Sequence, residues 1–368
     1  MMVYSEFDTI SISGVSVAVP TQEVALTSYY PHFGQETVDK IIESTGVQKI
    51  HRAQLEQTAS DLAFEAALNL QRKGKWKPEE IGILLFVSQK PDYRIPGTSY
   101  VLHKRLNLPS TCICLDLQLA CSGFMFGLQA IASLLLQINA PKALLLTGDT
   151  SIRTLAPQDR TMVMLFGDSG SAVVLEKDTA APSLAIGLRT DGNRFKSIIT
   201  PAGAFRKMDA EKERAAWSDG IERSEYDTHM KGMDVFGFSI TDVPALLKDF
   251  LLLRSLSNDD IDYYVLHQAN QYILKQLGRK LKIPVEKILI SLDRFGNNSS
   301  NSVPLVLCDH FGDVNDRVIK CIAAGFGAGL SLGCAHFTVD TNVIEPIFFT
   351  DSYYENAPFF SLGGEIYQ

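Results

Sequence analysis

The sequence predicts an α/β layered fold made of two similar halves. Short apolar runs typical of β-strands alternate with segments of helical periodicity, and this alternation occurs twice along the 368 residues. No Gly- or Ser-rich linker separates the two series, so we expect both halves to share one body. The series meet near residue 180. This predicts a first half over 1–180, a second half over 181–341 and an aromatic C-terminal extension over 342–368.

The first series has four predicted strands and two predicted helices, and the second has five strands and three helices. The charged segment 206–231 interrupts the second series. We expect it to be a solvated loop or short helical excursion, or a cap over an active site. The Phe and Tyr side chains of the extension are expected to pack on the body or on a partner chain. The strands are expected at 81–88, 111–118, 143–147, 172–175, 184–188, 263–267, 287–291, 318–324 and 331–337, and the helices at 59–73, 97–106, 243–254, 271–281 and 302–311.

Composition narrows the class of protein. An apolar fraction of 46% and a charged fraction of 21% are typical of a globular chain, and a net charge of −8 argues against general nucleic-acid binding. No apolar run approaches the ~20 residues that span a bilayer, and MMVYSEFDTI lacks the features of a signal peptide. We therefore expect a cytoplasmic protein with no membrane span. The six cysteines have no metal-ligand spacing, so we expect reduced thiols and no metal.

Cys121, in the stretch LACSGFMFG, is the first candidate for chemistry. It falls where a strand ends and an apolar, buried helix is predicted to begin. The positive end of the helix dipole would favour a thiolate there, lowering the thiol pKa from its free value of ~8.5. The alternative is a packing role, which is the commoner one for a cysteine among apolar residues.

Three further stretches carry candidate residues. His267 ends the apolar run YVLH and is followed by polar residues, although a lone histidine there is often structural. Asn297 lies in the amide-rich turn FGNNSSNS, where an asparagine is a turn former by default. The glycine-rich stretch 323–333 could aim backbone amides at a developing oxyanion, or simply form a tight turn between two core strands.

These stretches, taken in this order, resemble the motifs of the thiolase superfamily, and most closely those of its β-ketoacyl-acyl-carrier-protein synthase III group. The resemblance covers nearly the whole chain. It implies a five-layered αβαβα fold of two related halves, usually in a homodimer. The matching motifs are Ser44-Thr-Gly-Val47, Leu119-Ala-Cys-Ser-Gly-Phe124, Asp159-Arg160, Phe166-Gly-Asp-Ser-Gly-Ser-Ala172, His267-Gln-Ala-Asn270, Gly296-Asn297 and Gly325-Phe-Gly-Ala-Gly329.

The resemblance also implies roles for individual residues. Cys121 matches the nucleophile that accepts an acyl group from a thioester. His267 and Asn297 match the pair that holds a malonyl thioester carbonyl while carbon dioxide leaves. The backbone amides of Cys121 and Ala328 match an oxyanion hole. No bound cofactor is implied, since thioesters of coenzyme A or phosphopantetheine are substrates in fatty-acid or specialised lipid or polyketide synthesis. The residues that match substrate-binding positions are Phe166, Phe326, Asn270, Arg160 and Ile95.

Departures from the family pattern concern the substrate. Lys40 stands where the family often has a tryptophan that stacks on adenine, and Ser44 replaces an arginine, while Arg160 is retained. The coenzyme A site therefore looks incomplete, which favours a primer bound to acyl carrier protein.

Two further positions concern the carrier and the acyl chain. Arg279 and Lys280 match a basic patch that docks acidic carrier protein, although Tyr272 replaces another arginine of that patch. Ile95 matches a residue that reaches into the neighbouring subunit's acyl pocket. It is smaller than the phenylalanine of some members and is expected to leave room for a longer acyl group.

Two rival functions remain open at this point. An acyltransferase of the same fold could pass the acyl group to an amine or hydroxyl acceptor without decarboxylation. A non-catalytic partner of a condensing enzyme is also conceivable, although such partners usually lose the nucleophile or its helpers. We find no acid in the sequence matched to a position beside Cys121, which disfavours a hydroxymethylglutaryl-type condensation.

Overall fold

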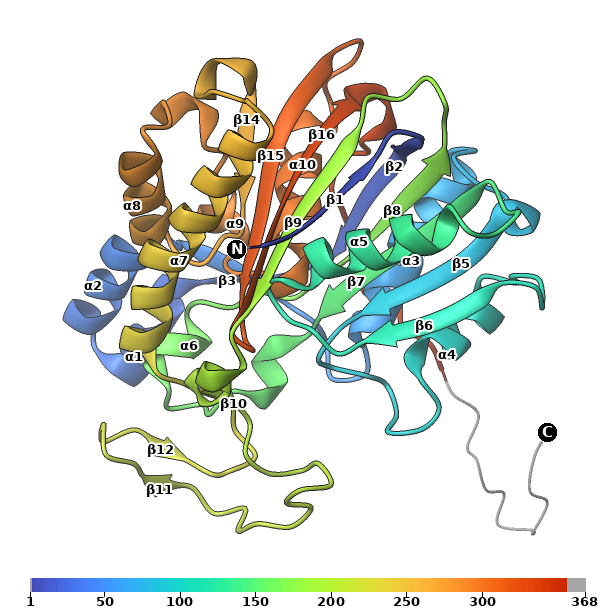
Figure 1. The fold of residues 1–368 in the computed structure, drawn as a ribbon. Helices are drawn as coiled ribbons and strands as arrows, with labels where there is room; N and C mark the ends of the chain where they lie inside the picture. The colour runs from blue at the N-terminus through green and yellow to red at the C-terminus, as the bar shows by residue number, and fades with distance from the viewer. Residues whose placement is uncertain (1, 356–368) are drawn as a thin grey trace, which may run out of the picture.

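The computed structural model describes residues 2–355 and has five layers, in which two β-sheets enclose a central pair of helices (Figure 1). Two more helices cover the outer face of each sheet. The five-layered αβαβα arrangement predicted above is therefore confirmed. The central helices are α5 (Gly123–Leu135) and α10 (Ser302–Phe311), and the outer pairs are α3 (Ala59–Arg72) with α4 (Thr98–Arg105) and α7 (Gly232–Leu253) with α8 (Gln271–Leu281).

The first sheet has six strands and the second has five. In spatial order the first runs β17 (Phe348–Phe349), β2 (Ile10–Val19), β8 (Ser169–Lys177), β7 (Lys142–Asp149), β5 (Ile81–Val87) and β6 (Ile113–Leu117). The second runs β1 (Val3–Phe7), β9 (Leu184–Thr190), β16 (Ser331–Asp340), β15 (Val318–Gly327) and β14 (Tyr263–Leu266).

Four strands in each sheet repeat one pattern of pairing. In the first sheet β2, β8, β7 and β5 join by two antiparallel contacts and then a parallel one. In the second, β9, β16, β15 and β14 join in the same way. The terminal strands cross over, because β1 joins the second sheet and β17 joins the first. A division of the chain at residue 180 remains our prediction for the two halves, with these two strands exchanged.

The central helix α5 is held by apolar contacts on both sides. Its sequence, GFMFGLQAIASLL, is apolar nearly all round, which suits a helix buried between two sheets. Phe124, Met125, Leu128 and Ile131 are buried in one core cluster with side chains of both sheets. The chain that enters this helix, which carries Cys121, is therefore fixed in the middle of the molecule.

Most predicted elements are present within a few residues, but the strand predicted at 287–291 is wrong. A short 3-10 turn at Val285–Lys287 precedes an irregular segment that makes one isolated bridge, between Ile288 and Tyr264. The amides of Ser291 and Leu292 donate instead to the side-chain oxygen of Gln268, at 3.0 and 3.3 Å. A side-chain amide thus takes the place of a neighbouring strand.

Helix α7 begins at Gly232, eleven residues before the predicted start at 243, and continues through Pro244. A proline inside a helix leaves the carbonyl four residues earlier without its amide donor, here that of Ile240. Lys280 Nζ, from the neighbouring helix α8, donates to this carbonyl at 2.7 Å. This cross-link supplies the missing hydrogen bond and ties the two outer helices together.

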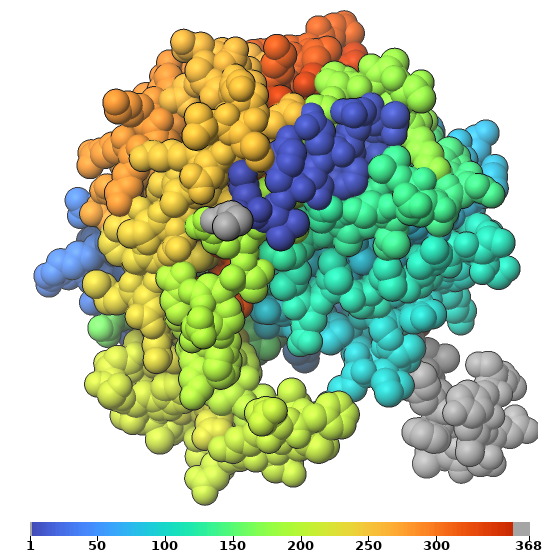
Figure 2. All heavy atoms as spheres, viewed as in Figure 1, coloured from blue at the N-terminus to red at the C-terminus, as the bar shows by residue number. Residues whose placement is uncertain are grey.

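The segment 206–231 forms small antiparallel strands rather than a helical excursion. It projects at the lower edge of the molecule in Figure 2. The extension as far as residue 355 packs on the body, where Tyr354 lies against Arg105. Residues 356–368 lie outside the described residues. The short strand pairs are β11 (Ala215–Ala216) with β12 (Glu222–Arg223), β10 (Ile198–Ile199) with β13 (His229–Met230), and β3 (Gln22–Ala25) with β4 (Lys49–Arg52).

Four short helices complete the described chain. They lie at the edges of the two sheets and in the loops around the centre. They are α1 (Tyr30–Phe33), α2 (Gln35–Thr45), α6 (Arg160–Val163) and α9 (Leu292–Phe295).

Candidate active site

Cys121 lies in the turn between β6 and α5, as the sequence predicts, and is half-buried. The end of β15 passes directly against it. A Cβ atom on Gly327 would lie 2.8 Å from Cys121 Cβ and 3.1 Å from its Sγ, and one on Gly325 would lie 2.7 Å from the Cys121 carbonyl oxygen. These two positions therefore need glycine, because a larger residue would push the thiol out of place.

The expected low pKa of the Cys121 thiol is not found. Burial, and to a lesser extent the nearby carboxyl of Asp149, raises this pKa to about 12. The resting residue is therefore a neutral thiol. Loss of its proton has to accompany the arrival of a substrate or a base.

His267 follows β14 and is buried beside the same turn. Its Nδ1 lies 2.9 Å from the Ser302 hydroxyl, which itself donates to the Ser299 carbonyl at 3.0 Å. Ser302 must then accept from Nδ1–H, which places the ring proton on Nδ1 and leaves Nε2 as a proton acceptor. Burial lowers the pKa of His267 to about 3, so the ring is neutral near pH 7.

Asn297 has a fixed orientation. Its backbone is held between Leu165 and Gly167, with the Asn297 amide donating to the Leu165 carbonyl at 2.8 Å and the Gly167 amide donating to the Asn297 carbonyl at 3.1 Å. Its side-chain oxygen accepts from the Ser299 amide at 2.9 Å. The NH₂ group is thereby left to donate to a substrate.

Two backbone amides near Cys121 have no internal acceptor. Among residues 2–355, neither the amide of Cys121 nor that of Ala328 donates to another residue. The carbonyl of Ala328 is held by the Ser331 hydroxyl at 3.0 Å, and the Ser331 and Ser122 hydroxyls lie 2.7 Å apart. The two amides belong to different turns, β6–α5 and β15–β16, and both residues line one pocket, so together they are candidates for an oxyanion hole.

Cys121 lies between two pockets that meet at its side chain. The histidine-side pocket, of about 150 Å³, includes Cys121, Phe166, His267, Asn270, Asn297 and Phe326 in its lining. The lysine-side pocket, of about 50 Å³, includes Cys121, Lys90, Asp149, Ser151, Thr154 and Ser299.

The structure brings only some of the other expected residues into this site. Phe166 and Phe326 line the histidine-side pocket, and Asn270 does too, although its side chain also caps α8 by accepting from the Ile273 amide at 2.8 Å. Arg160 is exposed at the start of α6, and Ile95 is 86% exposed.

The positions expected to bind coenzyme A and carrier protein lie outside both pockets. Arg279 and Lys280 are exposed in the last turn of α8. Lys40 makes an exposed ion pair with Glu36 at 2.7 Å, and Ser44 donates to the Ile41 carbonyl.

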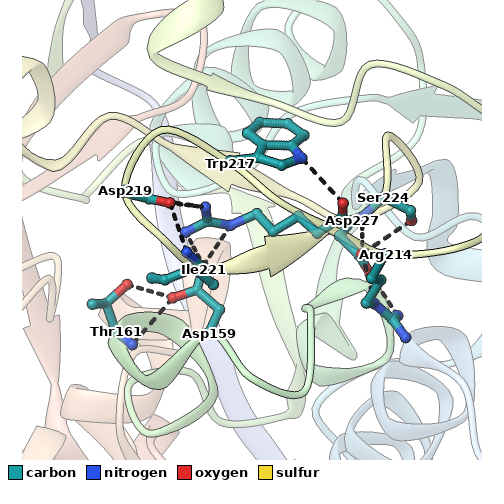
Figure 3. Close-up of polar contacts among 9 residues, drawn as sticks. Asp159, Thr161, Arg214, Trp217, Asp219, Ile221, Ser224 and Asp227 are labelled. Atoms are coloured by element: carbon teal, nitrogen blue, oxygen red, sulfur yellow. Dashed lines mark hydrogen bonds and ion pairs between the residues drawn. The ribbon is translucent and has the colours of Figure 1, made fainter.

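The charged segment is tied down beside Arg160 by a buried ion pair (Figure 3). Arg223 donates from Nε and Nη2 to Asp159 at 2.9 and 2.6 Å, and both side chains are almost completely buried. Thr228 and Met230, from the end of the segment, contribute to the pocket walls. Of the two expectations for this segment, the cap is the one that its position favours.

Three site residues were missed in the sequence. Ser302 orients His267, and Lys90 and Asp149 face the lysine-side pocket. Asp149 is an acid close enough to Cys121 to raise the pKa of its thiol, although the sequence shows no acid that matches the family position beside the cysteine. The only available signal was its place directly after the apolar run ALLLTG, where polar residues at strand ends often gather at a site.

Two general searches gave negative results for residues 2–355. No group of three or more His, Cys, Asp or Glu side chains there is placed to hold a metal ion. Nor does any helix in this range have the length and apolar character needed to cross a membrane.

The five layers and the cysteine at the start of a buried central helix define the class of thiolase-like proteins. Comparison with known proteins is consistent with this class. A model of 3-oxoacyl-[acyl-carrier-protein (ACP)] synthase III matches residues 115–192, and a model of its C-terminal part matches residues 253–339.

Similar proteins and solved structures identify the family to which the chain belongs. The chain is 33% identical to a β-ketoacyl-[acyl-carrier-protein] synthase III from Thermosynechococcus vestitus, over 89% of this chain and 98% of that protein. A crystal structure of a 3-oxoacyl-(acyl-carrier protein) synthase from Burkholderia xenovorans is 30% identical, with a TM-score of 0.89 over 95% of this chain and 99% of that one. The structure of the priming β-ketosynthase from the R1128 polyketide pathway, 22% identical with a TM-score of 0.76 over 91% and 97%, shares the fold.

The chain therefore belongs to the β-ketoacyl-[acyl-carrier-protein] synthase III family, and it is an acyltransferase of the condensing type. The resemblance inferred from the motifs is confirmed.

Proposed function

We propose that this protein catalyses a decarboxylative Claisen condensation in which Cys121 carries the acyl group and a malonyl thioester is the extender. The observation that carries the proposal is the meeting of two pockets at one thiol. Cys121, His267 and Asn297 line one pocket together, and two free amides, of Cys121 and Ala328, lie at the junction. This arrangement supports roles as nucleophile for Cys121, as base for His267, as amide donor for Asn297 and as oxyanion hole for the two backbone amides.

In the first half-reaction, Cys121 attacks the carbonyl of an acyl thioester. Its thiol has a pKa of about 12, so a base has to take the proton as the sulfur attacks. The unpartnered Nε2 of His267 is that base, and Nδ1–H stays on Ser302. The tetrahedral oxyanion accepts from the amides of Cys121 and Ala328. The carbon–sulfur bond of the donor breaks, and its thiolate leaves and takes the proton from His267, which returns to its neutral form.

In the second half-reaction, the malonyl thioester occupies the histidine-side pocket. Its thioester oxygen accepts from the Asn297 NH₂ group and from His267 in its other neutral tautomer, with the ring proton on Nε2. The carbon–carbon bond to the carboxylate breaks, carbon dioxide leaves, and the enolate attacks the acyl group on Cys121. The sulfur departs as a thiolate and takes a proton from solvent. Two hydrogen-bond donors to the thioester oxygen stabilise the negative charge of the enolate.

The carrier and the oligomer belong to the same proposal. Acyl carrier protein supplies the thioesters and docks at the exposed end of α8, where Arg279 and Lys280 lie, while Arg160 contacts the phosphopantetheine or coenzyme A arm.

The strand β6 pairs only with β5 in the described chain and exposes Ile113 and Leu115 by 39% and 38%. An apolar edge strand of this kind suits pairing with a second copy, which gives a homodimer and carries Ile95 towards the partner's site. We expect the protein to act in the cytoplasm.

The deciding experiment measures carbon dioxide released from a malonyl thioester carrying labelled carboxylate, with and without an acyl donor. We expect acyl-dependent release that matches the β-ketoacyl product one to one, and none with Cys121→Ala. Product formed on an amine or hydroxyl acceptor without release would establish the rival acyltransferase. If the wild-type protein takes up no acyl group, the remaining function is that of a non-catalytic partner of a condensing enzyme.

A further inference from the structure

The lysine-side pocket is small and mostly apolar, but its lining includes several polar side chains. Its volume is about 50 Å³, against about 150 Å³ for the histidine-side pocket. Lys90, Asp149, Ser151 and Thr154 line it together with Cys121. The apolar walls can hold the short alkyl part of an acyl group, whereas the polar side chains favour an acyl group that offers them a hydrogen bond.

Lys90 is the group in this pocket that lacks a partner. Among residues 2–355, its ammonium makes no hydrogen bond and no ion pair. The carboxylates of Asp149 and Asp168 act on it only through space, and burial lowers its pKa. A half-buried ammonium without a contacting acceptor is costly, so a substrate oxygen that accepts from it would be favoured.

Asp149 does not fill this role, because its oxygens accept from other groups and not from the Lys90 ammonium. One accepts from the Ser88 hydroxyl and from the Gln89 amide, each at 3.2 Å, and the other from the Ser300 hydroxyl at 3.5 Å. These bonds hold the carboxyl at the end of β7. The ammonium of Lys90 is left to face the pocket.

We propose that the acyl group accepted by Cys121 is short and carries an oxygen at its distal end, and that Lys90 donates to this oxygen. This inference rests on the proposed function and names its primer class. A terminal carboxylate and a hydroxyl share the required chemistry, since each offers an acceptor to an ammonium. Lys90 is then a specificity-determining residue with no part in bond breaking.

The test compares acyl transfer to Cys121 from coenzyme A thioesters that differ only at the distal end. Succinyl is paired with isocaproyl, in which two methyl groups replace the carboxylate oxygens, and β-hydroxybutyryl is paired with isovaleryl, in which a methyl replaces the hydroxyl. Initial rates of the adduct are measured by intact mass for the wild type, Lys90→Met and Lys90→Arg. Lys248→Met, an exposed change on α7, is the matched control.

We expect the oxygen-bearing member of at least one pair to load about tenfold faster than its alkyl partner in the wild type. The pair that responds distinguishes a carboxylate from a hydroxyl. Lys90→Met should abolish this preference while it still loads isovaleryl, which shows that the variant is folded. Lys90→Arg should keep part of the preference, and Lys248→Met all of it.

Two results would overturn the inference and leave the proposed function intact. One is equal or faster loading of both alkyl partners by the wild type, and the other is an unchanged preference in Lys90→Met. If the wild type takes up none of the four acyl groups nor any other thioester offered, the proposed function fails, and the inference fails with it.

Discussion

The two halves of the molecule share one pattern of strands but carry different chemistry at corresponding places. In the first half, the chain that enters the central helix α5 presents a thiol, Cys121. In the second half, the chain that enters α10 presents buried amides and hydroxyls instead, and Ser302 there orients His267. A repeated scaffold thus brings two helix starts to one point, and the side chains at each start decide which step it serves.

The largest effect on this division of the two reaction steps is expected at Asn297. Asn297→Ala removes a donor to the thioester oxygen of the extender, so carbon dioxide release should fall by about 10²–10³-fold. Acyl transfer to Cys121 should stay within a few-fold of the wild type, because Asn297 acts on the other substrate. Rapid-quench assays of each half-reaction give the two rates. An equal loss in both would show that the halves do not divide the steps.

The thiol itself gives the second test. With a pKa of about 12, its alkylation by iodoacetamide should rise about tenfold for each pH unit through pH 10 without a plateau. The sign follows from the thiolate, which is the reactive form and grows as the proton is lost. Alkylation is followed on the peptide that contains Cys121, and Cys121→Ser gives the background. A plateau below pH 9 would restore the lowered pKa first expected from the helix dipole.

A smaller effect on the rate of acyl transfer is expected at Ser302, which orients His267. Ser302→Ala removes the acceptor that keeps the proton on Nδ1 of His267, so acyl transfer should slow by about tenfold. Its pH profile should also shift, since the ring can then titrate more freely. Ser302→Thr retains the hydroxyl and should recover most of the rate. If the pH profile of acyl transfer in Ser302→Ala equals that of the wild type, Ser302 has only a packing role.

The smallest effect is expected far from the thiol, between the outer helices of the second half. Lys280→Met removes the exposed hydrogen bond to the Ile240 carbonyl and should lower the free energy of unfolding by about 0.5–1 kcal/mol, since water can replace the donor. Arg279→Met changes the adjacent exposed residue and should have no comparable effect. Urea denaturation compares the two. If binding of carrier protein weakens only in Arg279→Met, the docking role rests on that residue alone.

The sequence was most informative where one local signal decided the outcome. The apolar helix after Cys121, the glycines of β15 and the polar residues after β14 each placed their element correctly, because helix burial and close backbone approach leave clear patterns. The family motifs added Asn297, which a turn-forming segment alone would not distinguish.

Long-range contacts explain what could not be predicted. The segment 287–291 reads as a strand, yet the side chain of Gln268 takes its backbone amides. Pro244 reads as the first turn of a helix, yet Lys280 satisfies the carbonyl that the proline leaves free and the helix continues. The pKa of Cys121 follows from burial and from Asp149, which lies 28 positions away in the chain. The longer acyl group expected from Ile95 competes with the short one inferred from the lysine-side pocket, and it depends on the residue that a partner subunit would contribute.

The central claim is that Cys121 is the residue that carries the acyl group. Asn297→Ala, which should accumulate the acyl-enzyme, is incubated with the acyl thioester that loads fastest and a malonyl thioester, digested, and analysed by peptide mass spectrometry. Cys112 and Cys114 can share a peptide with Cys121, because no Lys or Arg lies between Arg105 and Lys142, so fragmentation assigns the modified residue. The account predicts one acyl group on Cys121 and none on the other five cysteines. An acyl group on another residue, or no adduct while product still forms, would contradict it.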